Sequence, residues 1–177
     1  IVEQSGDFTI EAYFLKHGVD NLGWRIKESD TRKFDPELLK THGIRGPAVR
    51  ELQKVGKIYV GDTLVSLDDV SSIRRGDVFS IAIDTLPCSN LLRIASHAKL
   101  FLCESTYLEA HRDLAREHSH LTAKQAASVA KEAQVGQLVL THFSARYQDL
   151  TDFEKEARAV FPRTIVAEDL KQILFLK

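Results

Sequence analysis

Apolar and polar positions follow one another along the chain in patterns that predict several strands. Residues 7–16 and 22–27 combine apolar and aromatic side chains at strand spacing, with a short polar turn between them. Residues 78–83 and 100–103 are unbroken apolar runs of the kind found in strands that are covered on both faces. Residues 137–141 are predicted to form another buried strand.

Helical patterns lie between the later strands. A helix is expected at 89–98, and Leu121-Thr122-Ala123 begins an alanine-rich helix expected at 123–133. A third helix at 151–160 precedes a last strand at 164–167. The alanine-rich helix carries one close-packing stripe, formed by Ala126, Ala127, Ala130 and Ala133. This alternation of strands and helices predicts an α/β layered domain.

Residues 29–76 differ from the rest, because they are charged and rich in turns. One short helix is expected to open at Asp35-Pro36, and another follows Gly46-Pro47. The short apolar pieces after them predict a thin hairpin rather than a core. We therefore expect an insertion at 29–76 in a domain made of residues 1–28 and 77–177.

Composition narrows the classes of protein. With 44% apolar and 28% charged residues, the chain of 177 residues is globular and not disordered. Its 24 basic and 25 acidic residues give a net charge of −1, so any contact with nucleic acid must come from a local basic patch. No apolar run has the roughly 20 residues that a membrane-spanning helix needs.

The cysteines and the first residue add two expectations. Cys88 and Cys103 are expected to be reduced thiols of an intracellular protein, although they could pair. No signal peptide is recognisable. The chain begins at Ile1 and contains no methionine, so we expect it to be part of a longer protein.

Three metal-capable side chains, His17, Asp84 and His142, each come just after an apolar run. The ends of strands open onto the crevice where ligands bind in layered α/β folds. Imidazole nitrogen and carboxylate oxygen are the ligands that a catalytic zinc accepts, and a carboxylate can also bridge two ions. The alternative is that the chain merely turns into solvent at these points.

The stretch from Phe101 to Tyr147 decides between these interpretations. It reads Cys-Glu-Ser-Thr at 103–106, His-Leu-Thr-Ala at 120–123 and Leu-Thr-His-Phe-Ser-Ala-Arg-Tyr at 140–147. This resembles ribonuclease Z, a zinc-dependent endonuclease family of the metallo-β-lactamase superfamily that removes the 3′ trailer from precursor tRNA. The resemblance extends over nearly the whole chain, from His17-Gly18-Val19 to Ala167-Glu168-Asp169. It implies the C-terminal half of an αββα sandwich with a protruding arm.

The resemblance also implies roles for individual residues. His17, Asp84 and His142 resemble ligands of two zinc ions, with Asp84 bridging them. Glu104 and His120 resemble the pair that moves a proton to the leaving oxygen, an arrangement in which a carboxylate orients an imidazole. The scissile phosphate would contact Thr122, Ser144 and Arg146, although Arg146 could instead be a structural ion-pair partner.

The insertion matches the position of the family's arm, which contacts the tRNA away from the cleavage site. Such an arm supplies affinity that does not depend on sequence but does depend on salt. Without the resemblance, the charged residues of the insertion would indicate only an ordinary solvent-exposed surface. The arm residues expected to contact RNA are Arg45, Gly46, Pro47, Arg50, Lys54 and Lys57. The resemblance further implies a cytoplasmic homodimer with no membrane association.

Several positions depart from the family pattern. Ile83 stands where glycine usually precedes the bridging aspartate, and the two loops read Glu-Ser-Thr and His-Leu-Thr. His118 lies close enough to His120 to be confused with it. Nothing resembles the family's His-x-His-x-Asp-His motif, which supplies the other metal ligands. We therefore expect an active enzyme in full-length form and an inactive isolated chain.

Two other functions fit parts of the pattern. One is a non-catalytic RNA-binding half of such an enzyme. Retention of the histidines, Asp84 and Glu104 argues against it. The other is a metallo-β-lactamase-fold hydrolase of small esters. The Gly46-Pro47 arm and the run from Ser144 to Tyr147 argue against that.

Overall fold

The computed structural model describes residues 1–175, which form two compact units. We call residues 1–28 and 77–175 the sheet unit. The segment Ser29–Gly76 is the inserted unit. Among the described residues, no helix has the length and apolar character to cross a membrane.

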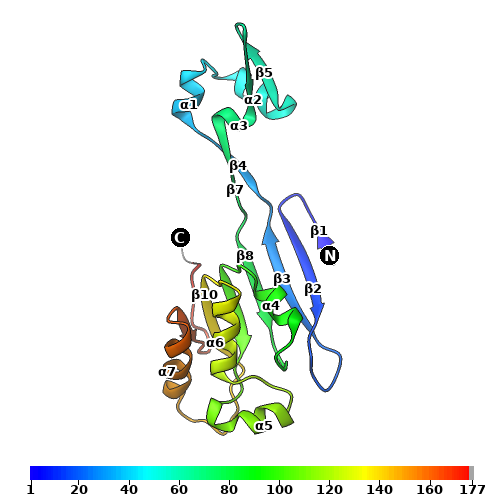
Figure 1. The fold of residues 1–177 in the computed structure, drawn as a ribbon, viewed down its shortest axis with the longest axis vertical. Coiled ribbons are helices and arrows are strands. Elements are labelled where there is room, and N and C mark those ends of the chain that lie inside the picture. The colour runs from blue at the N-terminus through cyan, green and yellow to red at the C-terminus, as the bar shows by residue number, and fades with distance from the viewer. Residues whose placement is uncertain (176–177) are drawn as a thin grey trace. The chain divides into compact units, whose positions relative to one another are not determined.

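The sheet unit is built on a seven-stranded sheet in the order β1-β2-β3-β8-β9-β10-β11. Its first four strands pair antiparallel, and β8 to β11 pair parallel (Figure 1). The strand bounds are β1 (Glu3–Gln4), β2 (Phe8–Phe14), β3 (Leu22–Glu28), β8 (Val78–Ala82), β9 (Leu100–Glu104), β10 (Gln137–Thr141) and β11 (Thr164–Val166).

Helices connect the parallel strands. They are α4 (Ser89–Ala95), the 3-10 helix η1 (Glu109–His111), α5 (Arg112–Glu117), α6 (Ala123–Glu132) and α7 (Thr151–Val160). The strand expected at 137–141 and the helix expected at 151–160 are confirmed. The other strands predicted for the sheet unit are also present, and each begins and ends within two residues of the predicted bounds. Parallel strands require such crossover connections, because the chain must return to the same end of the sheet.

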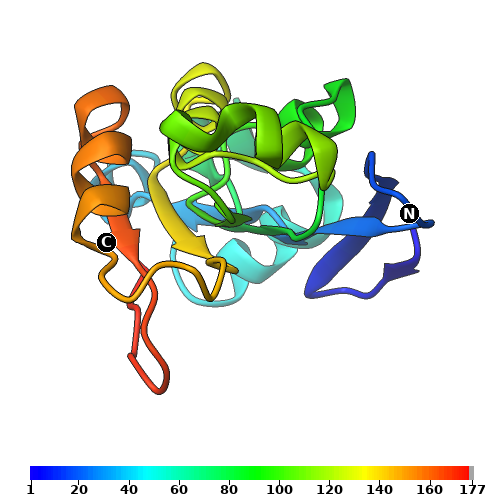
Figure 2. The same cartoon turned by 90° about the horizontal axis from the view of Figure 1, so that it is seen from below.

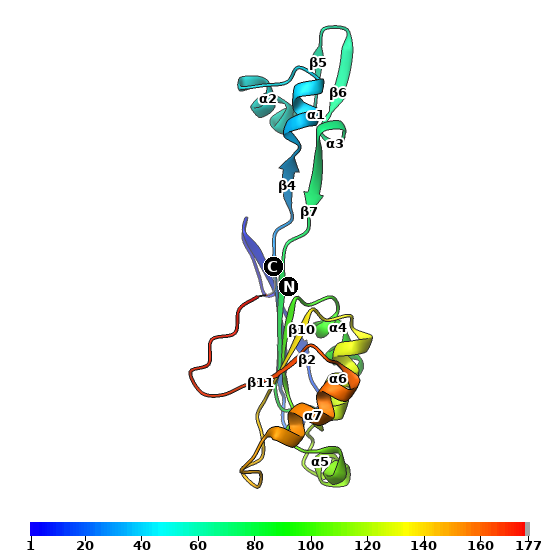
Figure 3. The same cartoon turned by 90° about the vertical axis from the view of Figure 1, so that its left-hand side faces the viewer.

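The core of the sheet unit lies between the sheet and α4, α6 and α7, which all cover one face (Figures 2 and 3). Phe101 and Leu138 from the sheet are fully buried there, together with Phe153 of α7. The alanine stripe of α6 faces this core. Small side chains let α6 approach both the sheet and α7 closely. The buried alanines of this helix are Ala123, Ala126, Ala127 and Ala130.

The opposite face of the sheet is also apolar. Strand register places one transverse row there, in which each residue lies beside the next on the neighbouring strand: Trp24, Ile81, Leu102, Val139 and Ile165. None of these side chains belongs to the helix-side core. The segment after β11 passes over this face (Figure 3). The ring of Phe175 packs edge-on against that of Phe79, with 6.1 Å between the ring centroids. Trp24 remains 37% exposed.

The inserted unit contains two small antiparallel sheets and three short helices (Figure 1). Asp35 caps the first helix as predicted, since its side chain accepts hydrogen bonds from two backbone N–H groups. The expected hairpin is present, but it was wrongly expected to contribute no core. Val65 packs in a small buried cluster with Ile44, Leu52 and Val70. The elements are β4 (Thr31–Phe34), α1 (Pro36–Thr41), α2 (Pro47–Val55), β5 (Lys57–Val60), β6 (Thr63–Ser66), α3 (Leu67–Val70) and β7 (Ser71–Arg74).

Candidate metal and hydrolytic site

Chemically active side chains gather where the strands of the sheet unit end. Glu104 is the last residue of β9, Asp84 lies two residues beyond β8, and His142 directly follows β10. These three strands are neighbours and run parallel, so their carboxyl ends meet at one edge of the sheet. His17 follows β2, and His120 comes from the turn between α5 and α6.

Two of these residues have an unusual backbone conformation. Asp84 has φ of 54° and His142 has φ of 57°, in the left-handed region that costs a non-glycine residue about 1–2 kcal/mol. The turn at Asp84 is held by Asn21, whose amide donates to the carbonyls of Ile83 at 2.5 Å and Asp84 at 2.8 Å. Strain of this kind is characteristic of functional sites, where it aims a side chain.

Asp84, His120 and His142 form a cluster whose potential ligand atoms all lie within 4.8 Å of one another. Oδ1 of Asp84 is 3.1 Å from Nε2 of His142 and 3.6 Å from Nδ1 of His120. This Oδ1 atom is buried, and among residues 1–175 it has no hydrogen-bond partner of acceptable geometry. Three ligand-type side chains therefore converge on one point.

Glu104 is fully buried next to this cluster and is hydrogen-bonded to several of the residues around it. Its Oε1 accepts from the backbone N–H of Thr85 at 2.5 Å and contacts Nδ1 of His120 at 3.1 Å. Its Oε2 accepts from the Thr106 hydroxyl at 2.7 Å and from the N–H of Leu121 at 3.0 Å. A carboxylate has about four acceptor sites. All four are used here, so Glu104 is satisfied as an anion.

This network assigns the tautomer of His120. A carboxylate only accepts, so Nδ1 of His120 must carry the hydrogen that it donates to Glu104. The longer contact from the same Nδ1 to Asp84, at 3.6 Å, is too long for a hydrogen bond. The Nε2 atom of His120 is therefore left available to hold or release a proton.

The same logic assigns the tautomer of His142. Thr106 donates its single hydroxyl hydrogen to Glu104, so the 2.9 Å contact between Thr106 Oγ1 and His142 Nδ1 requires that the imidazole be the donor. The Nε2 atom of neutral His142 then presents a lone pair to the carboxylate oxygen of Asp84. Two lone pairs at this distance repel each other unless a cation or a proton lies between them.

That arrangement fits a metal ion. Two ligands that share a tetrahedral zinc at about 2.1 Å each lie roughly 3.4 Å apart. The 3.1 Å between Asp84 Oδ1 and His142 Nε2 is close to that spacing. Metal-binding histidines generally donate their other ring N–H to an oxygen, as His142 does to Thr106. The donor set and the unpartnered Asp84 oxygen are both compatible with a transition metal.

His17 lies next to this cluster without joining it. Its ring centroid is 5.3 Å from that of His120, and its Nδ1 is 3.1 Å from the carbonyl oxygen of Ser119. A carbonyl accepts, so Nδ1 of His17 carries the hydrogen and Nε2 remains free. The sequence grouped His17 with Asp84 and His142, whereas the structure groups those two with His120. The three histidines share one tautomer, with Nε2 available in each.

Thr106 has a role that the sequence reading missed. It belongs to the Glu-Ser-Thr loop at 104–106, where the resemblance implies a role only for the glutamate. Thr106 is 5% exposed and lies between Glu104 and His142, which no local pattern reveals because the contact joins residues 36 positions apart. Its position in the loop motif was the available signal.

The structure places Thr122, an expected phosphate contact, at the N-terminus of α6. Its side chain is fully buried and caps α6, accepting from the N–H of Gln125 at 3.2 Å and donating to Glu109 at 2.7 Å. Gln125 completes a capping box by accepting from the N–H of Thr122. Thr122 thus caps α6, and its one hydroxyl hydrogen is donated to Glu109 and not available for a phosphate oxygen.

Ser144 and Arg146 lie in the loop after His142. Arg146 is exposed, and its guanidinium lies 5.5 Å from the ring centroid of Tyr107, a cation–π contact. No ion pair of Arg146 exists among the described residues, so the alternative of a structural ion pair receives no support. Ser144 is half-buried and its N–H donates to the carbonyl of Thr106 at 3.0 Å, which ties this loop to the Glu104 loop.

The predicted RNA-contacting residues of the inserted unit are all exposed at α2 or beside it. Gly46 has φ of 56° and precedes Pro47 at the first turn of α2, so glycine suits the conformation of this turn. Within the part of the chain that is described, Arg45, Arg50, Lys54 and Lys57 form no ion pair. From residue 40 to residue 57 there are five basic residues and one acidic residue.

Comparison with curated proteins gives a match over the entire chain. Ribonuclease Z of Protochlamydia amoebophila strain UWE25 is 60% identical over 177 residues, which is 100% of this chain and 58% of that protein. Ribonuclease Z of Chlamydia pneumoniae is 52% identical with the same coverage. The chain is homologous to part of ribonuclease Z. It spans about 58% of the length of these ribonuclease Z relatives. No family model matches it.

Solved structures give the same fold. The short form of human tRNase Z (ELAC1) has a TM-score of 0.60 at 22% identity, covering 99% of this chain and 46% of that one. The metallo-β-lactamase fold protein YhfI from Bacillus subtilis has a TM-score of 0.60 at 18% identity, covering 94% of this chain and 49% of that one. The expected fold class, part of a metallo-β-lactamase fold, is thus confirmed for this homologue of ribonuclease Z.

Proposed function

We propose that the full-length protein is a metal-dependent endoribonuclease that removes the 3′ trailer from precursor tRNA by phosphodiester hydrolysis and leaves a 3′-hydroxyl. One observation carries the proposal. Asp84 Oδ1 and His142 Nε2 lie 3.1 Å apart, a spacing that suits two ligands of one metal ion, and the buried Glu104 holds the ring of His120 through Nδ1. The relatives named ribonuclease Z support the substrate, precursor tRNA.

Asp84 and His142 would hold zinc, through Oδ1 and Nε2 respectively. When bound, the metal supplies a Lewis acid for the phosphate and lowers the pKa of a coordinated water. His17 is available as a further ligand through its free Nε2. A catalytic zinc takes three protein ligands, so these residues cannot fill two sites. We propose that the other ligands lie in the remainder of the full-length protein.

His120 would move a proton at Nε2. Glu104 accepts the hydrogen on its Nδ1, which fixes the orientation of the ring and leaves Nε2 as the atom that exchanges a proton. His120 is thus suited to protonate the leaving oxygen of the scissile phosphodiester. Burial of Glu104 excludes water from the pair and strengthens their interaction.

The inserted unit would bind the tRNA through Arg45, Arg50, Lys54 and Lys57, with Gly46 and Pro47 shaping the turn before α2. A surplus of exposed basic side chains without ion pairs is the usual basis of phosphate contacts. Arg146 and Ser144 remain proposed contacts of the scissile phosphate. A cytoplasmic location and a homodimeric active form complete the proposal and rest on the resemblance alone.

The test is cleavage of precursor tRNA by the full-length protein, with His120→Ala, Glu104→Ala and the double variant compared. Loss of a general acid typically lowers turnover 10²–10⁴-fold. Because the two residues act as a unit, the double variant should be little slower than either single one. His118→Ala is the matched control, since His118 is exposed and only stacks beside Tyr107.

The outcomes separate the candidate functions. Cleavage at the trailer junction that depends on His120 and Glu104 supports the proposal. Binding of precursor tRNA without cleavage would identify a non-catalytic RNA-binding half. Hydrolysis of small esters without action on RNA would identify the other hydrolase. Multiplicative losses in the double variant would show that Glu104 and His120 do not work together.

A further inference from the structure

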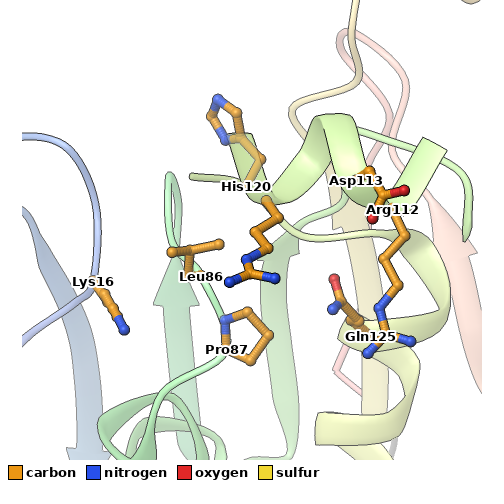
Figure 4. A pocket seen from close by; sticks show the side chains of 8 residues that line it. Lys16, Leu86, Pro87, Arg112, Asp113, His120 and Gln125 are labelled. Atoms are coloured by element: carbon orange, nitrogen blue, oxygen red, sulfur yellow. The ribbon is translucent and has the colours of Figure 1, made fainter. Parts of the chain in front are cut away.

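A cavity of about 500 Å³ opens beside His120 in the sheet unit. Lys16, after β2, lines one side, and Arg112 and Arg116 of α5 line another. Figure 4 shows Lys16 and Arg112 on opposite sides of Leu86 and Pro87, with His120 at the edge. Of the lining residues, only His120 also belongs to the Asp84–His120–His142 cluster and to the Glu104 network.

The cavity has a surplus of positive charge. Lys16, Arg112 and Arg116 face one acidic residue, Asp113. Within residues 1–175, Lys16 and Arg116 make no ion pair, and Arg112 reaches only Glu109, at 3.4 Å, with its own side chain 64% exposed. An exposed pair of this kind contributes little. Lys16 and Arg116 are therefore free to bind an anion, and Arg112 can join them by leaving its weak pair with Glu109.

The walls of the cavity are already fixed by hydrogen bonds. The backbone N–H of Lys16 donates to the hydroxyl of Thr85 at 3.2 Å, and the N–H of Leu86 donates to the carbonyl of Lys16 at 2.7 Å. His17 bonds to the carbonyl of Ser119, which precedes His120. These contacts join the loop after β2 to the segment that carries Leu86 and Pro87 and to the turn that carries His120. A preformed cavity of this kind binds a ligand without a large ordering cost.

The remaining lining suits the other parts of a nucleotide. Leu86 and Pro87 give an apolar surface against which a base or a ribose can pack. Gln125 already uses its carbonyl oxygen to accept from Thr122, so its amide N–H groups are left for a ligand. Asp113 can only accept when ionised, and a ribose hydroxyl is a donor that it can bind.

We propose that this cavity holds the ribonucleotide next to the scissile phosphodiester of the RNA. The phosphate of that nucleotide lies among Lys16, Arg112 and Arg116, and its ribose or base packs on Leu86 and Pro87. Arginine suits this role because its planar guanidinium can bind two phosphate oxygens at once. The proposal rests on the proposed function, because it takes His120, on the rim, as the residue that protonates the leaving oxygen.

The test uses binding of a fluorescein-labelled pentauridylate to the full-length protein in the presence of a chelator, so that no cleavage occurs. Fluorescence anisotropy is measured over a range of salt concentrations. Compared with the unmodified protein, the variant Arg112→Gln with Arg116→Gln should bind at least tenfold more weakly. The slope of log K against log salt should fall by about 1.4, because each phosphate contact to a single strand contributes roughly 0.7 to that slope. Lys16→Gln alone should produce about half that change in slope.

Two controls separate this cavity from general electrostatics. Lys131→Gln removes an exposed charge in the last turn of α6, outside the lining, and should leave pentauridylate binding unchanged. Lys155→Gln removes another exposed charge, in α7 and outside the lining, and should also leave it unchanged. Equal losses in these controls and in the arginine variant would overturn the proposal.

The result is independent of whether the protein processes tRNA. Weaker pentauridylate binding in the arginine and lysine variants supports the cavity as an RNA site even if precursor tRNA is not cleaved. Unchanged binding in folded variants overturns the site even if cleavage is intact. Thermal unfolding of each variant establishes that it is folded. All three side chains are exposed, so their neutralisation should not disturb the core.

Discussion

The hydroxyl of Thr106 lies 2.9 Å from Nδ1 of His142, and through this contact one threonine joins His142 to the Glu104–His120 pair. Thr106 can bridge them because it accepts from His142 while it donates to the buried Glu104. The threonine thereby fixes the tautomer of His142 and helps to hold the carboxylate that orients His120. The two halves of the proposed chemistry share one positioning residue.

Thr106→Val should weaken zinc binding by the full-length protein, because valine keeps the shape but cannot accept from His142. Loss of such outer contacts typically reduces metal affinity 10–100-fold. Thr106→Ser keeps the hydroxyl and should retain most of the zinc affinity. Competition with a chelator of known affinity gives the measurement. Equal zinc affinity in the Thr, Ser and Val proteins would exclude this role.

Thr122→Ala should lower stability by about 1 kcal/mol, because α6 loses its N-cap and Glu109 loses a donor. Thr122→Ser should be close to the unmodified protein. The KM for precursor tRNA should not change in either variant, since the buried hydroxyl makes no contact with the phosphate. Denaturant unfolding and steady-state kinetics measure the two effects. A raised KM at unchanged stability would restore Thr122 as a phosphate contact.

The sequence predicts the elements of the sheet unit well because their signals are local. Buried strands appear as short apolar runs, and the alanine stripe predicts which face of α6 is covered. Helix α6 begins at Ala123 as predicted, and Thr122 serves as its cap. Helix α4 ends at Ala95 and not at 98, and His97 takes a left-handed conformation with φ of 50°.

The geometry of the site could be predicted only in part. Strand-end positions identified Asp84 and His142, because an apolar run followed by a polar residue can be read locally. The entry of His120 into the ligand cluster depends on how the turn after α5 folds back toward β8, and nothing local in the sequence specifies that. The cap at Thr122 and the bridge at Thr106 likewise depend on partners elsewhere in the chain.

Neutralising Arg45, Arg50, Lys54 and Lys57 should weaken binding of precursor tRNA and flatten its dependence on salt. Each lost phosphate contact reduces the slope of log K against log salt by about 0.9 on duplex regions. Hydrolysis of a small nitrophenyl phosphodiester should barely change, because no long-range contact is needed. Filter binding and an absorbance assay give the two measurements. An equal loss on both substrates would make these residues structural.

Cys103 should resist alkylation in the folded protein, whereas Cys88 should react. Cys103 is fully buried. Burial, and to a smaller extent the nearby Glu104 carboxylate, raises the pKa of its thiol well above its usual range. The thiolate is the reactive form, so both exclusion and the raised pKa slow the reaction. Cys88 is partly exposed. Mass spectrometry after timed iodoacetamide treatment distinguishes the two, and faster labelling at Cys103 would contradict the described packing.

The central claim is that Asp84 is a metal ligand at a hydrolytic site, and Asp84→Asn in the full-length protein tests it most directly. Asparagine tolerates the left-handed backbone of this position and removes only the negative charge. Elemental analysis of the purified, folded protein should find its zinc content abolished, and cleavage of precursor tRNA should be lost with the metal. A normal zinc content in the Asp84→Asn protein would contradict the account.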